Sequence, residues 1–193
     1  MRQEEKQAKS SDIIRNHVGF SLAAALIPLP GADLIAVSAV QLNMLRQLAG
    51  LYQVGFMDTL GQNIISAVVG SSAARLGASL VKAIPGVGTI IGELSMPALS
   101  GASTYALGKV VANHFQLGGS LDDLDLKNAR KGYEVEVVNG KKVAEQMAQT
   151  TPAPKSASDE AVDKLQKLAE LKAAGIISEE EFGQLKTRLL TQI

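Results

Sequence analysis

The stretch "AAALIPLPGADLIAV", residues 23–37, consists of two apolar runs separated by prolines and a glycine. Proline disfavours the helical conformation in the residue before it, and glycine tolerates the backbone angles of a tight turn. The pattern Ile-Pro-x-x-Gly of residues 27–31 returns at residues 84–88, an offset of 57 (84 − 27 = 57). Each copy joins two apolar segments, which predicts two αα-hairpin corners.

These two corners define the expected helices of the apolar part of the chain. We expect helices over about residues 12–28, 32–52, 58–83 and 89–115. Asp33 follows the first corner, where its carboxylate can cap the start of the second helix. The residues expected to build the corners are Ile27, Pro28, Pro30, Gly31, Asp33, Ile84, Pro85, Gly86 and Gly88.

Small residues recur at every fourth position of the third and fourth expected helices. On an α-helix this spacing places them on one face, where a neighbouring backbone can approach closely. We therefore predict a helix-packing stripe in each of these two helices. Its members are Ser66, Gly70, Ala74, Ala78, Ala98, Ala102 and Ala106.

The composition favours helices and excludes several function classes. Hydrophobic residues make up 46% of the chain but aromatic residues only 4%, so the apolar surface comes from small and aliphatic side chains. The 19 basic and 19 acidic residues cancel, and no overall field attracts nucleic acid. Without cysteine the chain has no disulfide, thiolate metal site or cysteine nucleophile. The polar start carries no signal sequence, so we expect a cytoplasmic protein.

The charges are distributed unevenly, and this gives a domain map. Only 7 of the 38 charged residues (19 + 19 = 38) lie between Val18 and Phe115. We therefore expect a polar tail, an apolar helical-hairpin domain, a polar connector, a Pro/Ser-rich linker and a charged terminal unit. Their bounds are 1–11, 12–116, 117–149, 150–158 and 159–193.

The connector contains a turn signal. The segment "YEVEVVNGKKVAEQ", residues 133–146, alternates valine with glutamate and then reaches Asn139-Gly140. This dipeptide is the preferred centre of a two-residue β-turn between strands. We therefore predict a short β-hairpin in the connector.

The lengths of the apolar runs bear on a membrane location. The longest charge-free runs are residues 59–74, with 16 residues, and residues 18–32 and 94–108, with 15 each. A helix needs about 20 apolar residues to cross the hydrocarbon core. The sequence thus favours association with a membrane, such as the inner membrane, over spanning it, although insertion of the hairpins as a pore-like assembly stays an alternative.

The segment "KLAELKAAGIISEEEFGQLKTRLL", residues 167–190, predicts two short helices joined at Gly175. Ser178 and Glu181 have the spacing of a capping box that starts the second helix. Two helices of this size cannot bury their apolar faces alone, so we expect them to associate with a partner surface. The residues expected to mediate oligomerisation are Leu165, Leu168, Leu171, Gly175, Ile176, Phe182, Leu185 and Leu189.

Both halves of the chain resemble known families. Residues 163–190 resemble the short C-terminal domain family (SHOCT), which implies an oligomerisation or interaction module and no catalysis. Residues 12–116, with the IPxPGAD corner after "IIRNHVGFSLAAAL" and the later "KAIPGVGTIIG", resemble the bacterial domain of unknown function 697 of YcjF-type proteins. That resemblance implies membrane association and a GTPase partner acting in trans, because no phosphate-binding G-x-x-x-x-G-K-[ST] motif occurs in this chain.

Residues that could carry chemistry are few. Gly86, Gly88 and Gly92 lack the spacing and the preceding strand of a dinucleotide fingerprint. His17 and His114 have no metal-ligand spacing around them. We therefore expect an all-α, non-enzymatic, homo-oligomeric scaffold without catalytic, cofactor-binding or metal-binding residues. It would be membrane-associated, in contact with lipid, and would work with a GTPase.

Overall fold

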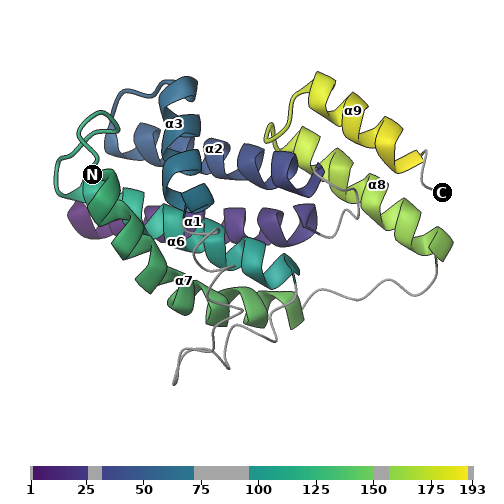
Figure 1. Cartoon of the computed structure of the whole chain (residues 1–193), viewed down its shortest axis with the longest axis horizontal. Coiled ribbons are helices and arrows are strands. Elements are labelled where there is room, and N and C mark those ends of the chain that lie inside the picture. The colour runs from purple at the N-terminus through teal and green to yellow at the C-terminus, as the bar shows by residue number, and fades with distance from the viewer. Residues whose placement is uncertain (1, 26–31, 72–95, 150–156, 191–193) are drawn as a thin grey trace.

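The computed structural model describes residues 2–25, 32–71, 96–149 and 157–190, and all regular secondary structure within these ranges is helical (Figure 1). Figure 1 shows the α2 helix above α1 and α6, with α7 below them and the α8–α9 hairpin at the end away from the N-terminus. The elements are α1 (Gln3–Ala24), α2 (Ala32–Tyr52), α3 (Asp58–Ile65), the π-helical turn η1 (Ser66–Gly70), α6 (Met96–Gln116), α7 (Leu126–Gln149), α8 (Ala157–Ala173) and α9 (Glu179–Leu190).

The main core lies between α1, α2, α6 and α7. Its apolar residues recur at three- and four-residue intervals on each helix, as the helical period requires. Its largest fully buried side chains are Ile14, Met44, Leu45, Leu48 and Leu107. The core thus unites helices that come from both the apolar half and the connector.

The predicted β-hairpin is wrong, because α7 runs without interruption through Asn139-Gly140. The buried positions of this segment are spaced by four, four, three and four residues, which is the period of a helix rather than a strand. They are Ala129, Tyr133, Val137, Gly140 and Ala144. The burial of this face against α6 therefore favours a helix over the turn that Asn139-Gly140 predicts.

The packing of α6 on α7 depends on small residues at their crossing. A Cβ atom built on Gly140 would lie 2.7 Å from the backbone oxygen of Ala102. Ala98, Ala102 and Ala106 are all buried on α6. The two helices therefore approach more closely than a larger residue at position 140 would allow.

The N-terminal helix begins earlier than the periodic apolar pattern. Residues 3–11, which we expected to form a polar tail, belong to α1. The acidic Glu4 and Glu5 lie in its first turn, where they interact favourably with the helix dipole. Glu5 also accepts a hydrogen bond from the backbone N–H of Arg2 at 3.2 Å.

The third expected helix divides into a regular and a wider part. The α3 helix ends at Ile65 and is followed by η1. The backbone oxygen of Ala67 in this turn accepts hydrogen bonds from Arg130 Nε at 2.8 Å and from the Ser71 hydroxyl. Arg130 belongs to α7, so it ties the π-helical turn to that helix.

Part of the predicted site falls outside the described residues. Asp33 lies in the first turn of α2, but its side chain is not among those described. The remaining corner residues and half of one stripe lie outside the described ranges: Ile27, Pro28, Pro30, Gly31, Ile84, Pro85, Gly86, Gly88, Ala74 and Ala78.

Candidate functional site

The C-terminal hairpin packs on one end of α1 and α2, where it forms a second apolar cluster. From the body, this cluster contains Ala24, Ala36 and Val40, with partly buried Phe20, Val37 and Ala39 beside them. From the hairpin, it contains Leu168, Leu171, Ile176, Ile177, Leu185 and Leu189, with Leu165 and Phe182 at its edge. The structure therefore brings the side chains expected to mediate oligomerisation together on one face and buries that face within the same chain.

The turn of this hairpin follows local rules. Gly175 has a φ of +67°, the left-handed conformation that glycine adopts at the end of a helix. The backbone N–H of Ser178 donates to Glu181 at 2.7 Å, and the N–H of Glu181 donates to the Ser178 hydroxyl at 3.2 Å. The Glu181 carboxylate and the Ser178 hydroxyl therefore both stabilise the start of α9.

One buried polar residue joins the hairpin to the body. Asn43 of α2 donates from Nδ2 to the backbone oxygen of Gly175 at 3.3 Å. Its Oδ1 lies 2.9 Å from Nε2 of His17 and accepts a hydrogen bond from Gln47 at 2.8 Å. His17 also contacts the backbone oxygen of Ile13 through Nδ1 at 2.7 Å. Asn43 therefore holds α1, α2 and the hairpin turn in one hydrogen-bonded chain.

A second polar network lies inside the four-helix core. The hydroxyl groups of Ser21 and Thr104 are 2.7 Å apart, and Gln41 donates to Ser103 at 3.1 Å and to Thr104 at 3.3 Å. Tyr133 donates its hydroxyl to Ser103 at 2.8 Å. Burial raises the pKa of Tyr133 to about 12, and the hydrogen bond with Ser103 opposes this rise in part. The network thus connects all four helices of the core, α1, α2, α6 and α7.

A groove of about 950 Å³ opens between α2, α3 and the hairpin turn. Its lining is mixed: Ile35, Leu42 and Ile177 are apolar, and Arg46 forms a salt bridge with Asp58 at 2.8 Å. The lining carboxylate of Glu181 is used in the capping box of α9. The salt bridge and the helix cap therefore stabilise the walls of the groove. Among the described lining residues, no nucleophile lies beside a base as catalysis would require.

The histidines have separate roles in the described structure. His114 lies at the end of α6, where Nε2 is 2.9 Å from Asp123 and 2.9 Å from the backbone oxygen of Ser120. The hydrogen bond from the Ser120 backbone N–H, followed by the one with His114, lowers the pKa of Asp123 below its usual value. Within the described residues, no three His, Asp or Glu side chains gather as a metal site would require.

The predicted packing stripes are placed differently on the two helices. The α6 members, Ala98, Ala102 and Ala106, are buried in the body. Ser66 and Gly70 are exposed on η1, and a Cβ built on Gly70 would meet nothing within 4 Å. The stripe on α6 therefore serves the contact within the bundle, whereas the described part of the other stripe faces outward.

Sequence reasoning missed the buried polar residues that hold the helices in register. Asn43, Gln41, Ser21 and Thr104 lie at positions where the helical period requires burial, and this spacing was an available signal. Polar residues at such positions need partners from another helix, because an unpaired buried polar group is costly. Their partners could not be identified without the packing of the bundle.

Comparisons with known proteins agree with the two resemblances. The family described as Domain of unknown function (DUF697) matches residues 1–132, and the Short C-terminal domain (SHOCT) matches residues 163–190. Magnetosome membrane protein 22 of Magnetospirillum gryphiswaldense (strain DSM 6361 / JCM 21280 / NBRC 15271 / MSR-1) is 34% identical over 140 residues, which cover 70% of this chain and 72% of the relative. No solved structure matches the chain significantly.

The hydropathy of the helices adds one observation. Within the described ranges, no helix combines the length and the apolar character needed to cross a bilayer.

The DUF697 match covers more than half of the 193 residues. The chain therefore belongs to the DUF697 family and ends in a short C-terminal domain.

Proposed function

We propose that this protein is a non-enzymatic, membrane-associated scaffold that assembles through its C-terminal hairpin. The observation that carries the proposal is the 34% identity to magnetosome membrane protein 22 over most of both chains. The description of this relative as a membrane protein supports a membrane location for this chain. Within this proposal, the chain lies at the cytoplasmic face of the inner membrane.

The use of polar groups in the structure supports a non-enzymatic role. The buried polar residues Gln41, Asn43 and Thr104 all bond to other side chains or to backbone groups of neighbouring helices. Bonds of this kind fix the register of a bundle, which is a structural role. Of the described carboxylates that line the groove, Asp58 forms a salt bridge and Glu181 caps a helix.

The hairpin supports a role in assembly. Its apolar face is buried against α1 and α2 of its own chain, and it follows residues 150–156, which are rich in threonine and proline. An element that docks on a site of its own chain can dock on the same site of a second copy at little cost. Exchange of the hairpin between copies would therefore form an oligomer from contacts that already exist in the monomer.

A GTPase partner in trans is part of the proposal through the family resemblance. The apolar domain resembles family members that are fused to, or encoded with, small GTPases. The test uses the purified GTPase encoded nearest to this gene, in its GTP-bound and GDP-bound forms. Calorimetric binding to one form in preference to the other supports the partnership, and no binding to either form removes it.

Membrane association is tested by fractionating cells that produce the full chain. We expect it in the membrane fraction and expect alkaline carbonate to release it, because carbonate removes peripheral proteins. Retention after carbonate would favour the pore-like alternative, in which the helices insert. A chain found entirely in the soluble fraction would refute membrane association.

Assembly is tested by light scattering on variants of the hairpin and its docking site. The first variant lacks residues 157–193 and carries Val40→Lys, which makes the uncovered surface polar; we expect a monomer. The second variant is full-length Val40→Lys: a monomer supports exchange onto α2, whereas an oligomer indicates contacts between hairpins. If the first variant keeps the same number of subunits per particle as the wild type, the hairpin is not the assembly module.

A further inference from the structure

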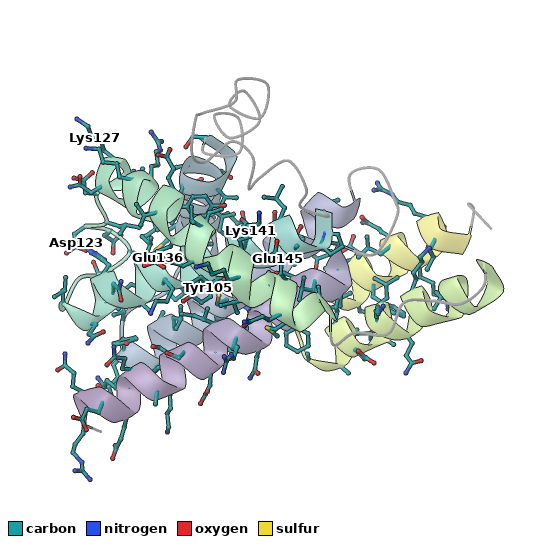
Figure 2. All side chains as sticks on the ribbon, turned by 90° about the horizontal axis from the view of Figure 1, so that it is seen from below. Tyr105, Asp123, Lys127, Glu136, Lys141 and Glu145 are labelled. Carbon is teal, nitrogen blue, oxygen red and sulfur yellow. The ribbon has the colours of Figure 1, made fainter. Side chains whose placement is uncertain are left out.

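The α7 helix has an outer face that combines lysines with exposed valines. We define the α7 outer stripe as Lys127, Lys131, Val135, Val138 and Lys142. All five side chains are exposed, and Val135 and Val138 have exposed fractions of 65% and 44%. Figure 2 shows α7 across the face seen from below, with Lys127 toward one end and Glu145 toward the other.

The spacing puts these residues on one side of the helix. They follow one another at four, four, three and four residues, so at 100° per residue they share one face over about 22 Å. The opposite face of α7 packs on α6 through buried residues such as Tyr133 and Val137. The α7 helix thus has a buried apolar face and an outer face that carries three lysines and two valines. Glu134 and Glu145 project on the same outer side of the helix, so the lysines give this face a net positive charge of one.

The acidic residues of α7 beside this stripe have interactions of their own, Glu134 among them. Glu145 pairs with Lys141, and Glu136 accepts a hydrogen bond from Asn139 while its charge helps raise the pKa of Tyr105, after burial. Arg130 is used on the backbone of η1. By contrast, no salt bridge joins the three stripe lysines to any other residue that the structure describes.

We propose that the α7 outer stripe is the surface through which this protein lies on an anionic lipid membrane. The proposal rests on the membrane association inferred above and assigns that association to one helix face. Charge complementarity favours this lipid surface. Lysines that form no salt bridge with a described residue and that flank exposed apolar side chains match negative headgroups above an acyl layer.

The chemistry of the stripe determines the kind of binding. Lysine side chains extend their ammonium groups to the phosphate level while their methylene stems cover apolar surface. Two valines bury little area, so the charges dominate and the binding is reversible and sensitive to salt. Each lysine near an anionic surface contributes about fivefold to binding, so loss of two lysines weakens it roughly 25-fold, and charge reversal weakens it further.

The test measures co-flotation of the full chain with lipid vesicles at low and high salt. One set of vesicles contains phosphatidylcholine with phosphatidylglycerol, and the other contains phosphatidylcholine alone. The stripe variant is Lys131→Glu/Lys142→Glu, and the control is Lys9→Glu/Lys186→Glu, which changes the net charge equally on exposed positions of α1 and α9. Circular dichroism verifies that all variants are folded.

We expect the wild type and the control to bind the anionic vesicles at low salt and the stripe variant to lose at least about 25-fold of that binding. Equal losses in both variants would overturn the assignment to α7 but leave membrane association intact. A wild type that binds neither vesicle would overturn this inference alone, because cell fractionation decides membrane association separately. Binding to polyglutamate in place of vesicles would assign the stripe to an acidic protein partner and would also overturn it.

Discussion

A single methyl group added at the α6–α7 crossing provides a sensitive test of the fold. At an exposed position inside a helix, replacing glycine by alanine stabilises a protein by about 1 kcal/mol, because alanine loses less conformational freedom on folding. At Gly140 the added Cβ would lie 2.7 Å from the backbone oxygen of Ala102 and 3.0 Å from two side-chain atoms of Tyr105. Neither a backbone oxygen nor a Cβ can move without shifting α6. We therefore expect Gly140→Ala to destabilise the protein.

The magnitude follows from two opposing contributions. Overpacking of a tight contact costs about 1–3 kcal/mol, and the gain in helix propensity offsets up to about 1 kcal/mol of this. With the full gain in helix propensity subtracted, the net loss is up to about 2 kcal/mol. For a chain of this size, each kcal/mol corresponds to about 2–4 °C in melting temperature. We thus expect Gly140→Ala to lower the Tm by a few degrees.

The assay is thermal unfolding followed by circular dichroism, with Gly50→Ala as the matched control. Gly50 lies in α2 of the same bundle and is exposed, and a Cβ atom added there would meet nothing within 4 Å. The control should therefore raise the Tm or leave it unchanged. If Gly140→Ala raised the Tm as much as Gly50→Ala, the close approach of α6 and α7 would be refuted.

Three further predictions concern the core, a loop and the hairpin. Burial raises the pKa of Tyr133 from about 10 to about 12, so the unfolded chain loses this proton at a lower pH than the folded chain. The free energy of unfolding therefore decreases as the pH rises between these values. In urea unfolding, Tyr133→Phe should show a smaller decrease over the same pH range. Asp123→Ala should accelerate hydrogen exchange of the Ser120 amide, and Asp122→Ala should not. Leu171→Ala should weaken hairpin docking by about 2–5 kcal/mol, seen as faster exchange in α8 and α9 with α6 unchanged.

Local signals were sufficient for the ends of the C-terminal hairpin. Gly175 has the positive φ that its position after an apolar helix predicts, and Ser178 and Glu181 make both hydrogen bonds of the capping box. These interactions join residues three or fewer positions apart, so the sequence contains all of their partners. The all-helical class was predictable for the same reason, because apolar spacing on each helix is a local property.

The connector shows where local reasoning fails. Asn139-Gly140 favours a tight turn only if two strands can pair beside it. In this protein Gly140 is needed for another reason, since only glycine fits against Ala102 at the helix crossing. Glycine is favoured both in a tight turn and at a close contact between helices. Which of the two applies at Gly140 depends on Ala102, which lies 38 positions earlier in the chain (140 − 102 = 38).

The hairpin illustrates a similar limit for the candidate site. Its apolar residues required a partner surface, and that requirement followed from the sequence. The identity of the surface did not, because Val40 and Ala36 of α2 are separated from Leu185 by more than 140 residues (185 − 40 = 145). Docking in the same chain and docking on a second copy satisfy the same apolar pattern. Only the linker and the concentration of the protein separate them energetically.

The hairpin and the α7 outer stripe are placed so that assembly and membrane contact can operate independently. The cluster that seats the hairpin draws its described members from α1, α2 and the hairpin itself, and none from α7. Exchange of the hairpin between copies would therefore leave Lys131, Val135 and Lys142 exposed. It follows that Val40→Lys should change the mass in light scattering without changing flotation, and Lys131→Glu/Lys142→Glu should do the reverse. If one variant altered both measurements, the two surfaces would be coupled, and oligomerisation would itself strengthen membrane binding by placing several stripes on one bilayer.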